Sequence, residues 1–154
     1  MEFRYLADHT EYIPTIAERY FRQWGDRSEA ENPKELQQVL HAYTNRRKIP
    51  LMLLAMEQDN LLGVVQLKYR EMDIYPEKLH WLGGIYVLPE MRGRGIAMKL
   101  VGHAEEIARA MKINTLYLQT ERLDGGLYAT LGWQPVEQVR YKGYDVLVMK
   151  KELV

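Results

Sequence analysis

The sequence predicts one α/β domain, and three features lead to that prediction. The first third carries two amphipathic helical patterns, and a strand–helix–strand passage runs from Leu79 to Thr120. Such a passage joins two parallel strands, because only a crossover connection returns the chain to the same edge of a sheet. No internal repeat, low-complexity segment or linker interrupts the 154 residues. We therefore expect residues 1–154 to form a single domain.

The N-terminal elements follow from apolar spacing and capping residues. Phe3 to Ala7 alternates as a first strand, and Glu11 to Trp24 carries apolar residues at helical spacing up to Gly25. Asn32-Pro33 is typical of a helix start, an N-cap followed by a first-turn proline. Arg46-Arg47-Lys48 is expected to close this second helix, because cations suit the negative end of its dipole.

The rest of the chain is expected to form six strands and two helices. Leu51 to Met56 and Leu61 to Tyr69 flank a turn at Gln58-Asp59-Asn60, which predicts a hairpin. A strand over Leu79 to Leu88 ends at Pro89, which has no N–H to continue a ladder. The later elements are a long helix over Arg92 to Lys112 stopped by Asn114, a strand over Thr115 to Thr120, a short helix over Leu127 to Leu131, and two strands within Trp133 to Lys150 around Lys142-Gly143.

Composition excludes several classes of function. Lys plus Arg and Asp plus Glu both total 21, so nothing attracts the whole molecule to nucleic acid or to an anionic membrane. The charged N-terminus does not resemble a signal peptide, and no stretch approaches the roughly 18 apolar residues of a membrane span. The expected location is the cytoplasm.

Candidate nucleophiles and metal ligands are scarce. The chain has no cysteine, which removes disulfides, thiolate metal sites and cysteine nucleophiles. His9, His41 and His103 show no metal-ligand spacing, so we predict no metal. Ser28 is the one serine and lies among charged residues. Any group transfer is therefore expected to be direct, with both substrates bound together.

A glycine-containing turn between a strand and the long helix forms a candidate anion site. Gly93 and Gly95 allow a ligand to approach the backbone closely, and Ala97 keeps the first helical turn narrow. Free N–H groups and the positive end of the helix dipole attract anions there. Arg92 and Arg94 add full charges, which makes a pyrophosphate a suitable ligand.

Three phosphate-binding motifs are alternatives for this turn. The spacing of a P-loop is absent. A dinucleotide fingerprint needs a third glycine where Met98 stands, although Glu121 could supply the acidic ribose ligand, so a nucleotide-binding oxidoreductase stays open. The pattern Arg/Gln-x-x-Gly-x-Gly/Ala fits Arg92, Gly95 and Ala97 without adjustment.

With this turn, the sequence resembles the GNAT family of N-acetyltransferases. Leu127-Tyr128-Ala129-Thr130-Leu131-Gly132-Trp133 is similar to the second motif of the family, and the order of elements agrees over essentially the whole chain. The resemblance implies an N-acetyltransferase that uses acetyl-CoA. It also implies a mixed, mostly antiparallel sheet of about seven strands with a splayed parallel pair, flanked by about four helices.

The resemblance implies specific cofactor contacts. Backbone groups of Ile85 and Val87 would pair with the pantetheine arm in a slot between the parted strands. Gly83-Gly84 in that strand indicates either a bulge or a close packing contact. The residues implied to bind the pyrophosphate are Arg92, Gly93, Arg94, Gly95, Ile96 and Ala97.

The same resemblance suggests how catalysis would work. Tyr128 is similar to the tyrosine that protonates the leaving thiolate, and a phenol pKa near 10 keeps that proton at neutral pH. The N–H of Val87 would polarise the thioester carbonyl. Many relatives carry a glutamate where Gly83 or Gly84 stands here. Substitutes for this base are His80, Tyr86 and Glu121, a water chain, or no dedicated base at all. Glu121 also replaces an asparagine that is common near the pantetheine.

The acceptor is the least defined part of the sequence. Acidic and aromatic residues just before the glycine-containing strand form a possible acid–aromatic wall, and residues after the first helix form a possible opposite wall. Together they would favour a cationic amine. An ordinary solvated loop explains the acid–aromatic residues equally well. Small-molecule and peptide amines both stay open, as do a monomer and a homodimer through the last strands. A coenzyme-A-binding module with weak or lost catalysis is the alternative function. The residues of the acid–aromatic wall are Tyr69, Glu71, Asp73, Tyr75, Glu77 and Trp81, and those of the opposite wall are Trp24, Asp26 and Glu29.

Overall fold

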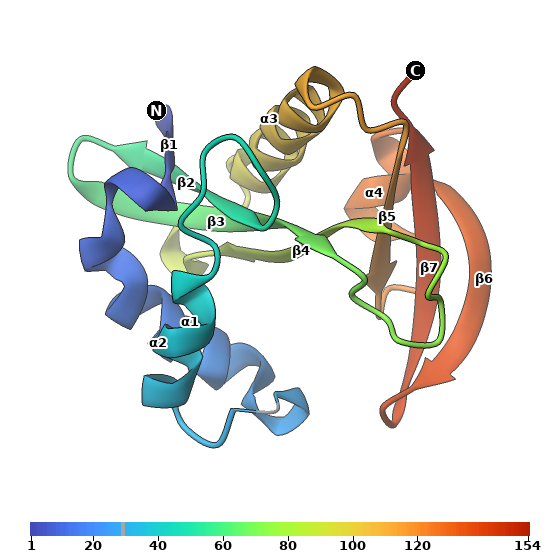
Figure 1. Cartoon of the computed structure of the whole chain (residues 1–154), viewed down its shortest axis with the longest axis horizontal. Helices are drawn as coiled ribbons and strands as arrows, with labels where there is room; N and C mark the ends of the chain where they lie inside the picture. The colour runs from blue at the N-terminus through green and yellow to red at the C-terminus, as the bar shows by residue number, and fades with distance from the viewer. Residues whose placement is uncertain (29) are drawn as a thin grey trace.

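A seven-stranded mixed sheet organises the protein, whose computed structural model describes residues 1–28 and 30–154. Across this described chain the strand order is β1-β2-β3-β4-β5-β7-β6 (Figure 1). β4 and β5 run parallel, and every other neighbouring pair is antiparallel. The expected mixed, mostly antiparallel sheet with one parallel pair is therefore confirmed.

The elements follow the predicted order. The strands are β1 (Glu2–Tyr5), β2 (Leu51–Glu57), β3 (Asn60–Tyr69), β4 (His80–Val87), β5 (Thr115–Thr120), β6 (Gln134–Tyr141) and β7 (Tyr144–Glu152). The α-helices are α1 (Ile13–Trp24), α2 (Pro33–His41), α3 (Ile96–Ala110) and α4 (Gly126–Thr130). Short 3-10 turns lie at η1 (Leu6–Asp8), η2 (Thr10–Tyr12), η3 (Gly25–Arg27) and η4 (Pro89–Met91). No helix in residues 1–28 or 30–154 is long and apolar enough to cross a membrane.

Helices cover both faces of the first half of the sheet. In Figure 1, α1 and α2 lie on one face and α3 lies on the other. β2 is buried between these layers, because its side chains alternate between two apolar clusters. Leu51 and Leu53 belong to the cluster with α3, whereas Met52 and Leu54 belong to the cluster with α1 and α2. The core therefore has one layer on each side of β2.

The start of α2 is confirmed, but its predicted end is wrong. The Asn32 side chain caps the helix by accepting a hydrogen bond from the Glu35 N–H at 2.9 Å. The helix ends at His41, before the cationic run that was expected to close it. Arg46 instead donates from Nε to Asp8 at 2.8 Å, which ties the segment after α2 to η1.

The long helix α3 is shorter at both ends than the pattern predicted. It begins at Ile96 rather than Arg92, because Gly93 and Gly95 have φ values of 80° and 77° that no helix contains. It ends at Ala110, and Lys112 rather than Asn114 adopts the left-handed conformation that stops it, with φ of 66°.

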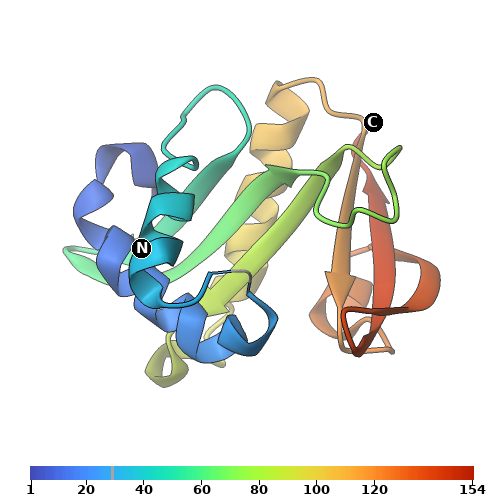
Figure 2. The same ribbon diagram turned by 60° about the horizontal axis from the view of Figure 1, so that its bottom comes forward.

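The sheet splits between its two parallel strands. Within the described chain, β4 and β5 pair at Trp81 and Tyr117 alone, near the start of β4. Figure 2 shows the two strands diverging from this point, so that β5, β7 and β6 form a separate wing. The predicted crossover and the splayed pair are both present. The gap widens toward the carboxyl ends of the strands, where ligands bind in open parallel sheets.

The two glycines of β4 form a bulge. Tyr86 pairs with Val64 and Gly83 pairs with Gln66, so β4 carries one residue more than β3 between these pairs. Gly84 has φ of 57°, and a Cβ on it would lie 2.6 Å from the Tyr20 hydroxyl. The bulge and the close packing contact, which the sequence offered as alternatives, are therefore both present.

Candidate active site

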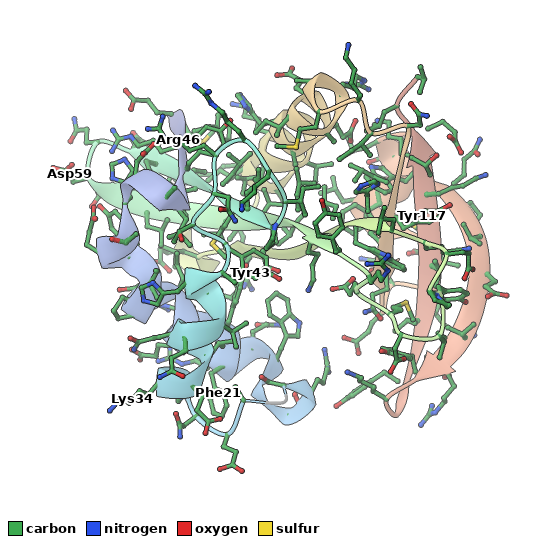
Figure 3. The ribbon with its side chains drawn as sticks, in the orientation of Figure 1. Phe21, Lys34, Tyr43, Arg46, Asp59 and Tyr117 are labelled. Carbon is green, nitrogen blue, oxygen red and sulfur yellow. The ribbon has the colours of Figure 1, made fainter. Side chains whose placement is uncertain are left out.

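A cleft of about 560 Å³ occupies the split between the two halves of the sheet. Tyr20 and Trp24 of α1 reach it from one half, and Tyr128 of α4 reaches it from the other. In Figure 3, labelled Tyr43 marks the side of the N-terminal helices and labelled Tyr117 marks β5. The other lining side chains come mainly from β3, β4, the end of β5 and the β6–β7 turn: Arg27, Gln66, Lys68, Glu71, Ile85, Glu121, Arg122, Tyr141 and Tyr144.

The predicted site residues fall into two places. Ile85 and Tyr128 line the cleft itself. Val87 and the turn from Arg92 to Ala97 are not among the described lining residues, but they lie where β4 leads out of the split. The structure therefore brings a slot and the glycine-containing turn next to each other along one strand.

The turn presents a row of free backbone donors. Among the residues that the structure describes, nothing accepts a hydrogen bond from the N–H groups of Gly93 through Met98. A Cβ on Gly93 would meet no atom within 4 Å, so glycine is needed there for its positive φ and not for space. Free N–H groups at the positive end of a 15-residue helix form a typical anion site.

The two arginines of the turn differ in their surroundings. Arg92 donates from Nε to the Val87 carbonyl oxygen at 2.9 Å, and its guanidinium lies 5.5 Å from the ring centre of Tyr86. Arg92 therefore braces the turn against β4. Arg94 is exposed.

The Val87 N–H points into the split. Leu88, one residue later, donates its N–H to Leu62 of β3 at 3.0 Å. Successive N–H groups of a strand point to opposite edges, so the Val87 N–H faces the side of β5. Since β4 and β5 have already separated there, this donor is available to a ligand.

Tyr128 is held in place by its packing. Its ring contacts Trp133 edge to face, with centroids 6.2 Å apart, and Trp133 in turn donates to the buried Glu105 carboxylate. Within the described chain the Tyr128 hydroxyl makes no hydrogen bond, so it is available to a ligand. Burial, assisted by the charge of Glu71, raises the pKa of Tyr128 to about 12.

Of the three side chains named as substitute bases, one lies in the cleft. His80 and Tyr86 are not among the described lining residues. The pKa of His80 is lowered by burial and by the charge of Arg70. Glu121 lines the cleft, but Arg27 donates to its carboxylate at 2.6 Å.

The acid–aromatic wall is wrong except for Glu71. Trp81 is fully buried in a third apolar cluster with Tyr75 and Met72, and Asp73 accepts a hydrogen bond from Tyr141 of β6 at 3.1 Å. Tyr69 and Glu77 are exposed. Glu71 alone of the six lines the cleft.

The opposite wall is partly present. Trp24 lines the cleft, whereas Asp26 accepts a hydrogen bond from Tyr144 of β7. Arg27, which the sequence did not single out, stacks 4.1 Å from the ring centre of Tyr144. These contacts join the segment after α1 to the C-terminal wing across the mouth of the cleft. Glu29 lies outside the described residues.

Sequence reasoning also missed Lys68, Gln66 and Tyr20 as cleft residues. Gln66 carries a recognisable signal, because it is a buried amide inside the apolar run of β3. Lys68 and Tyr20 carry none, since both fit ordinary strand and helix patterns. In residues 1–28 and 30–154, no group of three or more His, Asp or Glu side chains could hold a metal ion.

Comparison with known proteins identifies the family. The profile of the acetyltransferase (GNAT) family matches residues 12–133. No curated protein sequence matches the chain. Among solved structures, aminoglycoside 6'-acetyltransferase type Ii is 18% identical with a TM-score of 0.77, over 100% of this chain and 98% of that one.

Two other solved structures have the same fold. An aminoglycoside 6'-N-acetyltransferase complexed with coenzyme A is 16% identical, with a TM-score of 0.75 over 100% of this chain and 98% of that one. Ribosomal-protein-alanine N-acetyltransferase from Brucella melitensis is 19% identical, with a TM-score of 0.72 over 99% of each chain. The chain belongs to the GNAT acetyltransferase family, and it is an N-acetyltransferase that uses acetyl-CoA as its co-substrate.

Proposed function

We propose that this acetyltransferase moves the acetyl group directly from acetyl-CoA to a primary amine while both are bound in the cleft between β4 and β5. One observation carries the proposal: the strands part at Trp81 and Tyr117, and the gap opens toward the free N–H groups of the turn. A thioester arm can enter along β4 from the turn, and an amine can enter from the side of α1 and α2. We also propose that residues 1–154 act as one domain.

Coenzyme A would lie along β4 and the turn. The pyrophosphate would accept hydrogen bonds from the backbone of Arg92 through Ala97, where no protein group competes within the described chain. The pantetheine arm would pair with the backbone of Ile85 and Val87 like an added strand. The parting of β5 leaves this edge of β4 open.

The reacting groups would meet between Val87 and Tyr128. The Val87 N–H would polarise the thioester carbonyl as negative charge develops on its oxygen. The Tyr128 hydroxyl would give its proton to the departing sulfur. A pKa of about 12 supports this role, because the phenol holds its proton through the whole physiological range.

The side chains in the cleft support transfer without a covalent intermediate. There is no cysteine, and none of the four histidines is among the described lining residues. Ser28 lines the cleft, but its Oγ accepts a hydrogen bond from the Ala30 N–H at 3.0 Å. A serine without a base beside it is a weak nucleophile, which supports direct attack by the amine.

The acceptor is proposed to be a small-molecule or peptide amine. Enzymes for an aminoglycoside and for a ribosomal protein alanine share this fold, so the fold alone fits both kinds of acceptor. Release of coenzyme A thiol should be measured with acetyl-CoA and a panel of amines. Amine-dependent thiol release together with an acetylated product supports the proposal, and thiol release at the same rate without amine contradicts it.

Removal of either arginine of the turn should weaken coenzyme A binding. Arg92→Ala and Arg94→Ala should each cost about 1–3 kcal/mol if their hydrogen bonds to phosphate are direct. Arg92→Ala should also lower the melting temperature, because it removes the brace to Val87, whereas Arg94→Ala removes no such contact and should not. Calorimetry with coenzyme A and dephospho-coenzyme A separates pyrophosphate from 3′-phosphate contacts. Unchanged affinity in both variants would make the arginines ordinary surface charges.

The proton of Tyr128 should be retained well above neutral pH. Its folded pKa of about 12 is raised above its ordinary value near 10. The contribution of this proton to the free energy of unfolding is therefore complete below pH 10 and is lost as pH rises toward 12. We therefore expect kcat of the enzyme to show no alkaline decline from Tyr128 between pH 7 and 10. A decline with a midpoint below about pH 9.5 that disappears in Tyr128→Phe would contradict this.

A further inference from the structure

A carboxylate lies directly over the middle of β4, although β4 itself carries none there. Oε1 of Glu71 is 3.0 Å from the place where a Cβ on Gly83 would be. Glu71 belongs to the loop after β3, and its side chain, 16% exposed, lines the cleft. The absence of a side chain at Gly83 leaves the space that this carboxylate fills.

The position of Glu71 is fixed from both sides. Lys68, three residues earlier, donates from Nζ to Oε1 at 3.1 Å. Met72, the next residue, is fully buried in the third apolar cluster and anchors the loop. Burial lowers the pKa of the Lys68 ammonium, but Glu71 together with Tyr43 outweighs burial, so the pKa of Lys68 is raised and the ammonium keeps its charge at neutral pH.

Within residues 1–28 and 30–154, one oxygen of Glu71 has no hydrogen-bond partner. Lys68 uses Oε1, and no described residue donates a hydrogen bond to Oε2. An ionised carboxylate can accept about four hydrogen bonds. Because Glu71 lines the cleft, a molecule in the cleft can donate a hydrogen bond to Oε2. Oε2 is therefore available to a ligand.

Glu71 also acts on Tyr128 across the cleft. After burial, the charge of Glu71 is what raises the pKa of Tyr128, and it contributes to the raised pKa of Tyr20. The carboxylate and the two phenols thus surround one space, with Glu71 and Tyr20 on one half of the sheet and Tyr128 on the other.

We propose that Glu71 is the group that receives the acceptor: Oε2 binds its ammonium and takes the proton that the amine must lose before attack. This rests on the proposed function. The nitrogen lone pair then forms the C–N bond, and the C–S electron pair leaves on sulfur. Tyr128 gives its proton to the sulfur and regains one from the nitrogen. The products are an amide, a thiol and a protonated Glu71, which releases its proton to solvent.

The surroundings of Glu71 restrict which amines the site accepts. The charge of Lys68 already balances that of Glu71, so the site gains from a cation chiefly through the hydrogen bond to Oε2. Aromatic rings of Tyr20, Trp24 and Tyr43 line the same side of the cleft. A primary ammonium on an apolar or hydroxyl-rich molecule suits this combination. The aromatic side chains attract the cation through their ring faces and offer a flat surface on which the rest of the acceptor can stack.

Glu71→Gln is the first test, because it keeps the shape and removes the charge. With acetyl-CoA and three probe amines (kanamycin, spermidine and an alanyl dipeptide), kcat/KM for the best acceptor should fall about 10²-fold or more. The Kd of acetyl-CoA should stay within about twofold, since Glu71 does not touch the turn. The matched control is Glu77→Gln, an exposed acid of the same loop, which should retain full activity.

Moving the carboxylate is the second test. Glu71→Ala should lose activity, and adding Gly83→Asp should restore at least about tenfold, because residue 83 then points a carboxylate into the vacated space. Gly83→Asn in the same background has the same shape without charge and should restore nothing. The contacts of a Cβ at position 83 are ends of flexible side chains, Glu71 and Lys68, so the change is tolerable.

The outcomes separate this inference from the proposed function. If the parent enzyme fails to release thiol with any of the three probe amines, the proposed function fails. If the parent is active and Glu71→Gln stays within threefold of it, or Asn restores as much as Asp, Glu71 is only a structural partner of Lys68. Should the double variants not fold, Glu71→Gln with its unchanged acetyl-CoA Kd decides alone.

Discussion

Replacement of Tyr128 by Phe is expected to lower kcat by roughly 10²–10⁴-fold while the affinity for acetyl-CoA stays near the parent value. The change removes one hydroxyl and keeps the ring that packs against Trp133. Because the hydroxyl makes no hydrogen bond within the described chain, its loss should cost little stability. Turnover and melting temperature should be measured on the same preparation.

A purely structural role for Tyr128 predicts the opposite pattern. Stability would then drop modestly, and turnover of the folded enzyme would barely change. Tyr117→Phe is the matched control, because Tyr117 is a tyrosine of β5 that packs on Trp81 outside the set of lining residues. A fall below threefold in Tyr128→Phe, with chemistry shown to be rate-limiting, would remove Tyr128 from the mechanism.

Gly95→Glu is expected to abolish coenzyme A binding while leaving the fold intact. A carboxylate at the head of α3 would place a negative charge where the pyrophosphate should lie, and its side chain would cover the free N–H groups. Isothermal titration calorimetry should detect no binding at coenzyme A concentrations that saturate the parent enzyme.

Backbone strain must be separated from this effect. Gly95 has φ of 77°, so any other residue there costs about 1–2 kcal/mol of stability. Gly95→Ala shares the strain without the charge, and its Cβ would meet only the Met98 side chain, at 3.8 Å. Binding should therefore weaken far less in Gly95→Ala. Equal affinities in the parent and in folded Gly95→Glu would show that the pyrophosphate binds elsewhere.

Local rules explain what the sequence could predict. Glycines that need positive φ, a proline after a strand and a capping asparagine act within a few residues, so the turn, the end of β4 and the start of α2 followed from pattern. The parallel pair followed from handedness and connection length. The boundaries of α3 did not follow, because the turn glycines occupy the positions that apolar spacing assigned to its first turn.

Long-range packing explains what the sequence could not predict. Alternating acids and aromatics from Tyr69 to Trp81 resembled the wall of a binding site, but Trp81 and Tyr75 turn into a small core under the loop. Glu71 came to the cleft because Met72 anchors that loop and Gly83 leaves space. No pattern of neighbouring residues encodes such a meeting between two strands and a loop.

Steady-state rates of thiol release, with acetyl-CoA and the best amine varied together, test the central claim most directly. Direct transfer in a ternary complex predicts intersecting double-reciprocal lines, an acetylated amine, and no acetyl group on the protein after incubation with acetyl-CoA alone. Parallel lines with an acetylated protein would contradict direct transfer. Tight coenzyme A binding without amine-dependent thiol release would contradict the catalytic account as a whole.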